Sequence, residues 1–551
     1  MRRSRRFHAI AIAVLTLTAA GFAAAPPGGA AAIATSDLRQ WLGFIASDAL
    51  EGRATFGTGI GLAAAYIGDH LGRWGVTPAG DAGSYLQTVR VNGVTVTSRS
   101  SLTVRVGGVT RTFADGEGVT FPRNAGAPQD LTVDRVVFAG YGLDAPAAGH
   151  EDFRGHDVSG AAVVWLGLKG PTGMEAGRYR RVLSGRPRTA LDQLGAAAVM
   201  GPQDRGDEGP QASPRAADAV DFTTVERLDR VRAPAVTVSR DVLAFLFSGA
   251  PESYETLERQ AEAQEPLPFF ALDGVSLTFH VEADYTIVRT QLTHNVVGLV
   301  EGTDPALART YVALGAHYDH VGYAQNAVRD GRRPQAPGRV TDGALDDRVW
   351  NGADDDGSGT VALMALARAF AQGPRPKRSL LFVWHTGEER GLYGSRYFAE
   401  FPEVPIGEIV AQLNLDMIGR NRDDKPSESN TVYVVGSDRI STELDQVLRA
   451  ANAGLDPPLT IDYEMNDPSD PEQVYYRSDH YSYAAKGIPI IFFTTGMHAD
   501  YHANTDDVSK IEFDKLARVA QLVYETSAMV ANLDHPPARD HLGPRAGRTT
   551  R

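Results

Sequence analysis

Residues 378–390 read RSLLFVWHTGEER, a nearly continuous apolar run that ends in a histidine and two glutamates. Four further segments in the second half of the chain are also nearly continuous in apolar residues: TYVALGAH (310–317), VAQLNLDM (410–417), TVYVVG (431–436) and IPIIFFTT (488–495). Such runs are typical of strands whose two faces are both covered. A helical pattern, SGTVALMALARAFAQ (358–372), lies among them. The sequence therefore predicts an α/β fold, with a mixed central sheet and helices on both faces.

The composition narrows the chemistry that this chain can support. The 551 residues carry a formal net charge of −14, which argues against a nucleic-acid partner because such a partner favours a basic face. There is no cysteine, so disulfides and thiolate zinc sites are both excluded. Any metal ion must be held by histidine, aspartate and glutamate, a donor set that suits catalytic zinc.

The first residues have the pattern of an export signal. A basic segment, MRRSRRFH (1–8), precedes an apolar run (9–25) and then small residues. This order predicts a secretory signal peptide over 1–34 and a periplasmic or extracellular location. The apolar run is short for a membrane span, so we expect no stable membrane insertion after cleavage.

Potential metal ligands gather where the predicted strands of the second half end. In open α/β sheets this edge binds ligands. A carboxylate in an apolar strand, such as Asp416, is costly to bury unless it is paired or bound to a cation. The candidates are His317, Asp319 and His320; His385, Glu388 and Glu389; Asp416; and His498, His502, Asp506 and Asp507.

The stretch NGADDDGSG (351–359) places three aspartates directly before a predicted helix. It is consistent with a solvated turn or with a cradle for cations. A calcium-binding EF-hand loop is excluded, because Gly352 and Leu363 occupy the first and twelfth places, where acidic ligands are needed. An aspartate at a helix start can bridge two cations, because it has two oxygens and the helix N-terminus tempers its charge.

Six motifs in this order resemble the two-zinc aminopeptidase family that includes the bacterial leucyl aminopeptidases and, more distantly, glutamate carboxypeptidase. They are GAHYDHVG (315–322), NGADDDGSG (351–359), GEERGLYGS (387–395), NLDMIG (414–419), RSDHYSYAAKGIP (477–489) and DYHANTDD (500–507). The helical segment 51–76 is similar to the N-terminus of such enzymes. Residues 128–255, a β-rich segment, resemble the protease-associated domain often inserted in this family.

The resemblance implies two zinc ions and a ligand for each position. His317 and Asp416 would bind one zinc, and Glu389 and His502 the other. Asp355, the middle aspartate of the triplet, would bridge the two.

The resemblance also implies catalytic roles. Glu388 would act as general base and acid, and Asp319 would orient His317. A tyrosine would steady the tetrahedral intermediate, with Tyr501 as the candidate in one branch of the family and Tyr475 or Tyr476 in another. Three histidines have no family role, and we interpret them as supports of the site or surface residues: His320, His385 and His498.

The predicted function is that of an exported zinc aminopeptidase acting on peptide substrates. One alternative is a zinc carboxypeptidase or dipeptidase, in which Arg477 or an arginine of the insert 321–347 would hold a free carboxylate. That insert is either a lid or rim of the substrate pocket or a loose loop. A further alternative is a non-catalytic receptor-like relative. No feature of the sequence indicates an oligomeric state.

The predicted organisation is a signal peptide (1–34), the N-terminal part of the peptidase domain (35–127), the inserted domain (128–255), the catalytic domain (256–535) and a disordered tail (536–551).

Overall fold

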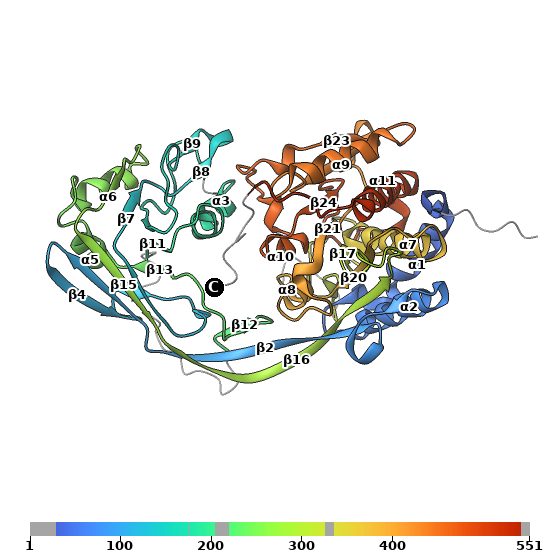
Figure 1. The fold of residues 1–551 in the computed structure, drawn as a ribbon, viewed down its shortest axis with the longest axis horizontal. Helices are drawn as coiled ribbons and strands as arrows, with labels where there is room; N and C mark the ends of the chain where they lie inside the picture. The colour runs from blue at the N-terminus through green and yellow to red at the C-terminus, as the bar shows by residue number, and fades with distance from the viewer. Residues whose placement is uncertain (1–28, 176, 204–219, 326–335, 542–551) are drawn as a thin grey trace, which may run out of the picture.

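The computed structural model describes residues 29–175, 177–203, 220–325 and 336–541. Figure 1 shows two lobes side by side, joined underneath by the long strands β2 (Leu86–Ser98) and β16 (Ala283–Val300). These strands pair antiparallel from Leu86 opposite Val296 to Ser98 opposite Ala283. One continuous ribbon therefore runs from the larger lobe into the smaller one.

The larger lobe is built on a ten-stranded sheet with the order β12-β2-β16-β20-β17-β21-β24-β22-β23, and β1 pairs with β16. Neighbours among β20, β17, β21 and β24 are parallel, whereas β16 and β22 pair antiparallel with the outer members of this group. The remaining bounds are β1 (Thr77–Pro78), β12 (Phe222–Thr224), β17 (Tyr311–His317), β20 (Ser379–His385), β21 (Ile409–Leu415), β22 (Thr431–Val435), β23 (Thr460–Asp462) and β24 (Ile490–Thr494). The predicted mixed sheet is confirmed, and each of the five apolar runs forms a strand.

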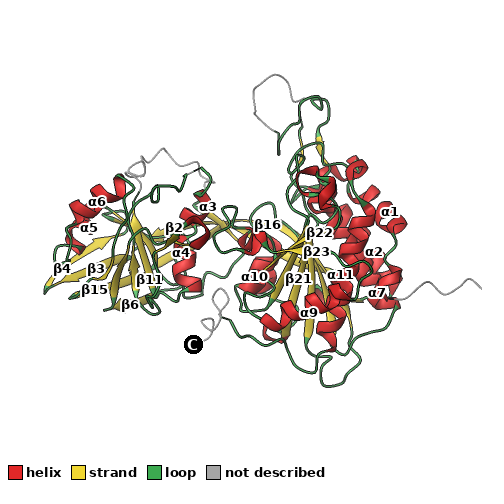
Figure 2. Cartoon of the chain, turned by 90° about the horizontal axis from the view of Figure 1, so that it is seen from above, coloured by secondary structure: helices red, strands yellow, loops and turns green. Residues whose placement is uncertain are grey.

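Helices cover both faces of this sheet (Figure 2). Alternate residues of β17 and β20 explain why: Leu314 and Phe382 lie in one apolar cluster, and Ala313 and Leu381 lie in the other. The first cluster includes α1 (Thr35–Ile45), α2 (Thr58–Trp74), α7 (Gly359–Gln372), α9 (Thr442–Ala453) and α11 (Phe513–Asn532). The second includes α8 (Tyr393–Glu400) and α10 (His480–Ala484).

The smaller lobe contains two sheets that share one apolar core, with Leu102, Phe138 and Phe279 among its buried residues. Its first sheet has the order β14-β7-β10-β11-β13-β5 and parallel central strands. The second is antiparallel, with the order β4-β3-β15-β6. The strands are β3 (Ser101–Val106), β4 (Val109–Ala114), β5 (Val119–Thr120), β6 (Gln129–Val133), β7 (Val136–Ala139), β10 (Ala162–Val164), β11 (Ala198–Pro202), β13 (Ala235–Val238), β14 (Phe269–Ala271) and β15 (Val275–Val281).

This lobe also carries the short pair β8 (Asp144–Ala145) and β9 (His150–Glu151), with helices α3 (Arg180–Ser184), α4 (Arg186–Arg188), α5 (Arg240–Leu246) and α6 (Tyr254–Glu262). The predicted insert 128–255 lies within it, although the lobe's strands run from Ser101 to Val281. One of its contacts with the larger lobe is at Tyr476, where the Arg188 guanidinium carbon lies 3.5 Å from the ring centroid.

Both predicted terminal segments lie partly outside the described residues. The signal peptide is described only from residue 29 and the tail only to residue 541. Among the residues described, none of the helices combines the length and apolar character that crossing a bilayer requires.

Candidate metal centre and active site

The parallel strands of the larger lobe bring the predicted metal ligands to one edge of the sheet. His317 is the last residue of β17, Asp416 directly follows β21, and Glu389 lies in the loop after β20. His502 lies in the loop after β24, and Asp355 lies in the turn before α7. Because parallel neighbours end on the same side, residues far apart in sequence meet there.

The five predicted ligands form two groups that share Asp355. The Nε2 atom of His317 lies 3.2 Å from Asp355 Oδ1 and 3.7 Å from Asp416 Oδ1. On the other side, His502 Nε2 lies 3.1 Å from Asp355 Oδ2 and 2.9 Å from Glu389 Oε2. The two oxygens of Asp355 therefore face different groups, which is the arrangement that a bridging carboxylate requires.

Several donor atoms of these groups are buried without a hydrogen-bond partner among the described residues. They include His317 Nε2, Asp355 Oδ2 and Glu389 Oε1. Buried polar atoms are normally satisfied, and buried charges are normally paired or bound to a metal. Two clusters of three donors, His317–Asp355–Asp416 and His320–Asp355–Glu389, have atoms within 4.8 Å of one another. The donor set thus fits two cations held by nitrogen and oxygen.

The electrostatics of these residues also indicate a cation site. Burial disfavours the imidazolium of His317, but Asp416 and the other carboxylates outweigh it and raise its pKa well above the usual value. At His502, the carboxylates of Asp355 and Glu389 likewise outweigh the effect of burial and raise the pKa to about 10. Burial opposes the charge of Asp355, yet His317 and His502 hold the pKa of that carboxyl well below its usual range. Positive charge is therefore favoured at the positions where cations would bind.

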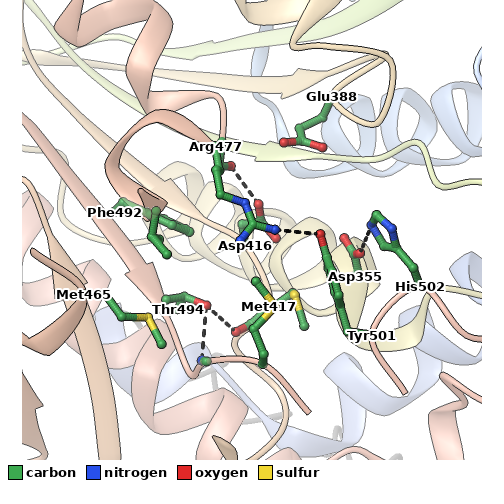
Figure 3. Close-up of a pocket in the computed structure, with 14 residues that line it drawn as sticks. Asp355, Glu388, Asp416, Met417, Met465, Arg477, Phe492, Thr494, Tyr501 and His502 are labelled. Atoms are coloured by element: carbon green, nitrogen blue, oxygen red, sulfur yellow. Dashed lines mark hydrogen bonds and ion pairs between the residues drawn. The ribbon is translucent and has the colours of Figure 1, made fainter. Parts of the chain in front are cut away.

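Glu388 points into the pocket formed beside these ligands (Figure 3). Burial raises the pKa of its carboxyl well above the usual value, and the nearby carboxylates of Asp416 and Glu389 act in the same direction. Its backbone amide donates to Asp319 Oδ1 at 3.1 Å. Glu388 is thus a half-buried carboxyl that favours its protonated form in the metal-free protein, and its position depends on the loop that carries it.

Asp319 contacts both His317 and the Glu388 loop. The Nδ1 atom of His317 lies 3.1 Å from the backbone carbonyl of Asp319 and 3.6 Å from its carboxylate. The carboxylate also accepts the hydroxyl of Thr55 at 2.9 Å. The orienting role of Asp319 stays a prediction, and its atom nearest to His317 Nδ1 is the main-chain oxygen rather than the side chain.

The flanking aspartates of the triplet, Asp354 and Asp356, bind backbone amides. Asp356 accepts from the amides of His317, Gly359 and Met417 at 3.1, 2.9 and 3.2 Å. Asp354 accepts from the Gly419 amide at 2.6 Å. These bonds connect the turn that carries Asp355 to the strands that carry the other ligands.

Of the three candidate tyrosines, Tyr501 is the one that lines the pocket in the part of the chain that the structure describes. Its hydroxyl accepts a hydrogen bond from Arg477 Nη2 at 3.2 Å, and its ring stacks on His502. Tyr475 is buried in an apolar cluster, and the hydroxyl of Tyr476 accepts from Gln193 of the smaller lobe. Tyr501 is therefore the tyrosine placed to contact a substrate.

Sequence reasoning missed the apolar side of the pocket and the pairing of Arg477 with Tyr501. The apolar wall consists of Met417, Met465, Val474, Phe492 and Met497. These residues come from separate segments, and each also fits an ordinary core position. No local pattern could have identified them as neighbours.

The described part of the 321–347 insert supports the loop that carries His502. The amide of Arg339 donates to the His502 carbonyl at 2.7 Å, and the indole of Trp350 donates to the Arg339 carbonyl at 2.9 Å. His502 has a φ of 53°, a strained region for a residue other than glycine. These contacts help to hold this ligand in place, whereas residues 326–335 lie outside the description.

The surface interpretation of the three unassigned histidines is wrong, because all three are buried. His385 Nε2 lies 3.0 Å from the Tyr483 hydroxyl, and His498 Nε2 lies 3.2 Å from Asp354. His320 Nδ1 lies 2.8 Å from Glu389 Oε1. Each histidine therefore contacts the site or the residues that support it.

Comparison with known proteins gives one family and several relatives. The model described as Peptidase family M28 matches residues 295–527. "Leucine aminopeptidase 1" of Trichophyton equinum is 26% identical over 240 residues, which are 42% of this chain and 56% of that protein. "Leupeptin-inactivating enzyme 1" of Streptomyces exfoliatus is 33% identical over 159 residues, 28% of this chain and 32% of its own. The chain thus spans little more than half the length of the first of these relatives.

Two solved structures align over most of the chain. A zinc aminopeptidase from Bacillus subtilis is 17% identical, covers 94% of this chain and 98% of its own, and has a TM-score of 0.43. An aminopeptidase from Aneurinibacillus sp. strain AM-1 is 18% identical, covers 93% and 97%, and has a TM-score of 0.42. The family match leaves out most of the smaller lobe, so its protease-associated identity stays a prediction.

Proposed function

Because the model of peptidase family M28 matches residues 295–527, we propose that this chain is a zinc-dependent aminopeptidase that removes N-terminal residues from peptides. The observation that carries the proposal is the position of Asp355, whose two oxygens face separate donor groups beside Glu388. A shared carboxylate next to a free acid–base group suits hydrolysis by an activated water.

The proposed residues would hold two zinc ions. His317, Asp416 and Asp355 would hold one ion, and Glu389, His502 and Asp355 the other. When bound, the metals supply Lewis acidity and lower the pKa of water to near neutrality. Nitrogen and carboxylate donors without thiolate suit zinc in a catalytic site.

Glu388 supplies the proton transfer in this proposal. Its carboxyl is half-buried and carries a raised pKa, so it holds a proton readily. Nearby cations would lower that pKa towards neutrality, which lets the carboxylate accept a proton from the attacking water. The same group then passes the proton to the leaving amine.

Tyr501 is positioned to stabilise the oxyanion of the tetrahedral intermediate. Arg477 donates to the oxygen of Tyr501, so the phenolic proton is free to point elsewhere. A donor that is fixed before the reaction stabilises developing negative charge without reorganisation. The pair Arg477–Tyr501 is therefore proposed as the oxyanion contact.

The pocket supports recognition of a free N-terminus and an apolar side chain. Its apolar wall offers flexible methionines, which adapt to side chains of different shape. The carboxylates of Asp416 and Glu388 at the other side would attract an ammonium group. A carboxypeptidase needs a free cation instead, and Arg477 is engaged by Tyr501 and by Glu472, 3.0 Å away.

A substrate panel tests the proposal directly. Peptides with a free N-terminus and an amidated C-terminus should be cleaved, and their N-acetylated counterparts should not. A chelator should abolish the cleavage, and added zinc should restore it. Cleavage that required a free C-terminus and tolerated acetylation would overturn the aminopeptidase proposal in favour of the carboxypeptidase.

We also propose that the chain is exported, on the basis of the basic and apolar segments within 1–34. Expression of the full chain and of a form lacking this segment provides the test. The full chain should appear outside the cytoplasm with a new N-terminus, and the shortened form should remain inside. An uncleaved, cytoplasmic full chain would contradict the proposal.

A further inference from the structure

His320 lies against the donor group that contains Glu389 and His502, and the proposed mechanism gives it no role. Its Nδ1 atom is 2.8 Å from Glu389 Oε1 and 3.9 Å from Asp355 Oδ2. The side chain is 1% exposed. The ring centroids of His320 and His502 are 5.8 Å apart. His320 thus faces the space that the second metal would occupy.

The ring nitrogens of His320 lack the hydrogen bonds that buried histidines normally make. Neither Nδ1 nor Nε2 makes a well-directed hydrogen bond to a described residue, and the same holds for Glu389 Oε1. By contrast, His385 meets the Tyr483 hydroxyl and His498 meets Asp354. An unsatisfied buried imidazole is destabilising unless something else occupies its lone pair. A cation between His320, Glu389 and Asp355 would be bound by the three unpartnered atoms Nδ1, Oε1 and Oδ2 that face one another.

The backbone around His320 fixes the ring in this position. Its amide donates to the Arg53 carbonyl at 3.2 Å, which attaches the segment to the N-terminal part of the chain. Gly352 lies against the ring, because a Cβ atom there would come within 2.5 Å of His320 Cγ. The backbone of His320 is therefore held by Arg53, and the close approach of Gly352 limits the movement of the ring.

We propose that His320 is a fourth protein ligand of the second metal, together with Glu389, His502 and Asp355; this rests on the proposed two-metal function. Bonds of about 2.0 Å at tetrahedral angles separate ligand atoms by roughly 3.3 Å. The separations within this group, from 2.8 to 3.9 Å, bracket that value. Four side chains would therefore be enough to fill a tetrahedral site for the second metal.

The two metal positions then differ in kind. One has a single imidazole, from His317, and two carboxylates, whereas the other has two imidazoles and two carboxylates. A site with four protein donors should fill first and release its metal last. The three-donor site keeps an open position, as catalytic sites do.

Cobalt(II) alone is the probe for the test. The full chain, labelled at histidine, is titrated with cobalt(II), and contact-shifted imidazole resonances are counted by NMR. Three shifted rings are expected if His320 is a ligand, with the first equivalent of metal giving two of them. His320→Ala should remove one of these rings and weaken the first binding event by at least about tenfold.

The matched control is His498→Ala, which removes a buried histidine that contacts Asp354 instead of the donor atoms. It should leave all three shifted rings in place. Two shifted rings in the unaltered protein would overturn the His320 proposal, and His320→Gln should then bind metal as tightly as wild type. This count needs no variant, so it decides the question even if His320→Ala fails to fold.

The outcomes also separate this proposal from the proposed function. Two shifted rings in a protein that still cleaves free N-termini would refute only the role of His320. A protein that binds no cobalt and cleaves no peptide would refute both.

Discussion

The two lobes contain parallel strands of similar kind, yet their strand ends differ. In the larger lobe β17 ends in His317 and β21 is followed by Asp416. In the smaller lobe β7 is followed by Gly140 and β10 by Trp165. Both sheets have buried apolar strands, so the architecture alone does not distinguish them. The difference shows that the chemistry depends on a few side chains at one edge and not on the sheet itself.

The largest effect on this difference between the lobes is expected when the carboxylate shared by both donor groups is removed. Asp355→Ala should reduce the bound metal below two equivalents and bring peptidase activity to background, because the donors on each side lose their common carboxylate. Metal content is measured by elemental analysis after dialysis. Activity is measured on a peptide with a free N-terminus. Asp157→Ala, at an exposed position of the smaller lobe, is the control and should change neither. Two retained zinc ions would refute the bridging role.

Glu388→Gln should separate catalysis from metal binding. We expect a fall in kcat of roughly 10²–10⁴-fold, the usual contribution of a general base, while both metals stay bound. The metal-free variant should unfold at an unchanged temperature, because burial already favours the neutral carboxyl and glutamine resembles it. The same substitution at Glu151, a partly exposed strand residue of the smaller lobe, should leave kcat unchanged. Full activity of Glu388→Gln would remove Glu388 from the mechanism.

Tyr501→Phe tests which tyrosine contacts the oxyanion. Loss of one fixed donor should lower kcat by roughly 10²-fold and change KM little. Tyr475→Phe is the matched control, because its hydroxyl is buried without a hydrogen-bond partner among the described residues. Steady-state kinetics of the two variants distinguish the family branches. A large effect at Tyr475 with none at Tyr501 would reverse the assignment.

The pH dependence of zinc binding follows from the raised pKa values of His317 and His502. With a pKa of about 10, His502 carries a proton at neutral pH in the metal-free protein, and this proton must leave before zinc binds. Zinc affinity should therefore rise with pH between about pH 6 and about pH 9, by roughly tenfold per unit for each proton released. Calorimetry across this range gives the slope, and His502→Gln should lower it by about one proton. A flat profile would contradict these protonation states.

The sequence was sufficient for the parts of this site that depend on local pattern. Strand ends such as His317 and Asp416 follow apolar runs, so both their position and their common edge could be predicted. The contacts of Arg53 could not be predicted in this way. Its guanidinium donates to the carbonyls of Tyr318, Asn351 and Gly352 at 2.9, 2.7 and 2.8 Å. It thus supports two loops that carry predicted metal ligands, from 265 to 299 residues away in sequence, and no local periodicity marks such a contact.

The contact between the lobes gives the smallest expected effect and the sharpest test of their independence. Arg188 of the smaller lobe stacks on Tyr476, which directly precedes Arg477, and Arg477 holds Tyr501. A cation–π contact of this kind is worth about 0.5–2 kcal/mol. Arg188→Ala should therefore lower kcat/KM by about twofold to thirtyfold, because Arg477 is held less firmly. Arg178→Ala is the control, since Arg178 lies over Tyr179 of its own lobe.

Equal kcat/KM values for both variants would mean that the smaller lobe does not influence the pocket through this contact. A selective loss in Arg188→Ala would show that the smaller lobe contributes to catalysis by positioning a residue of the larger lobe.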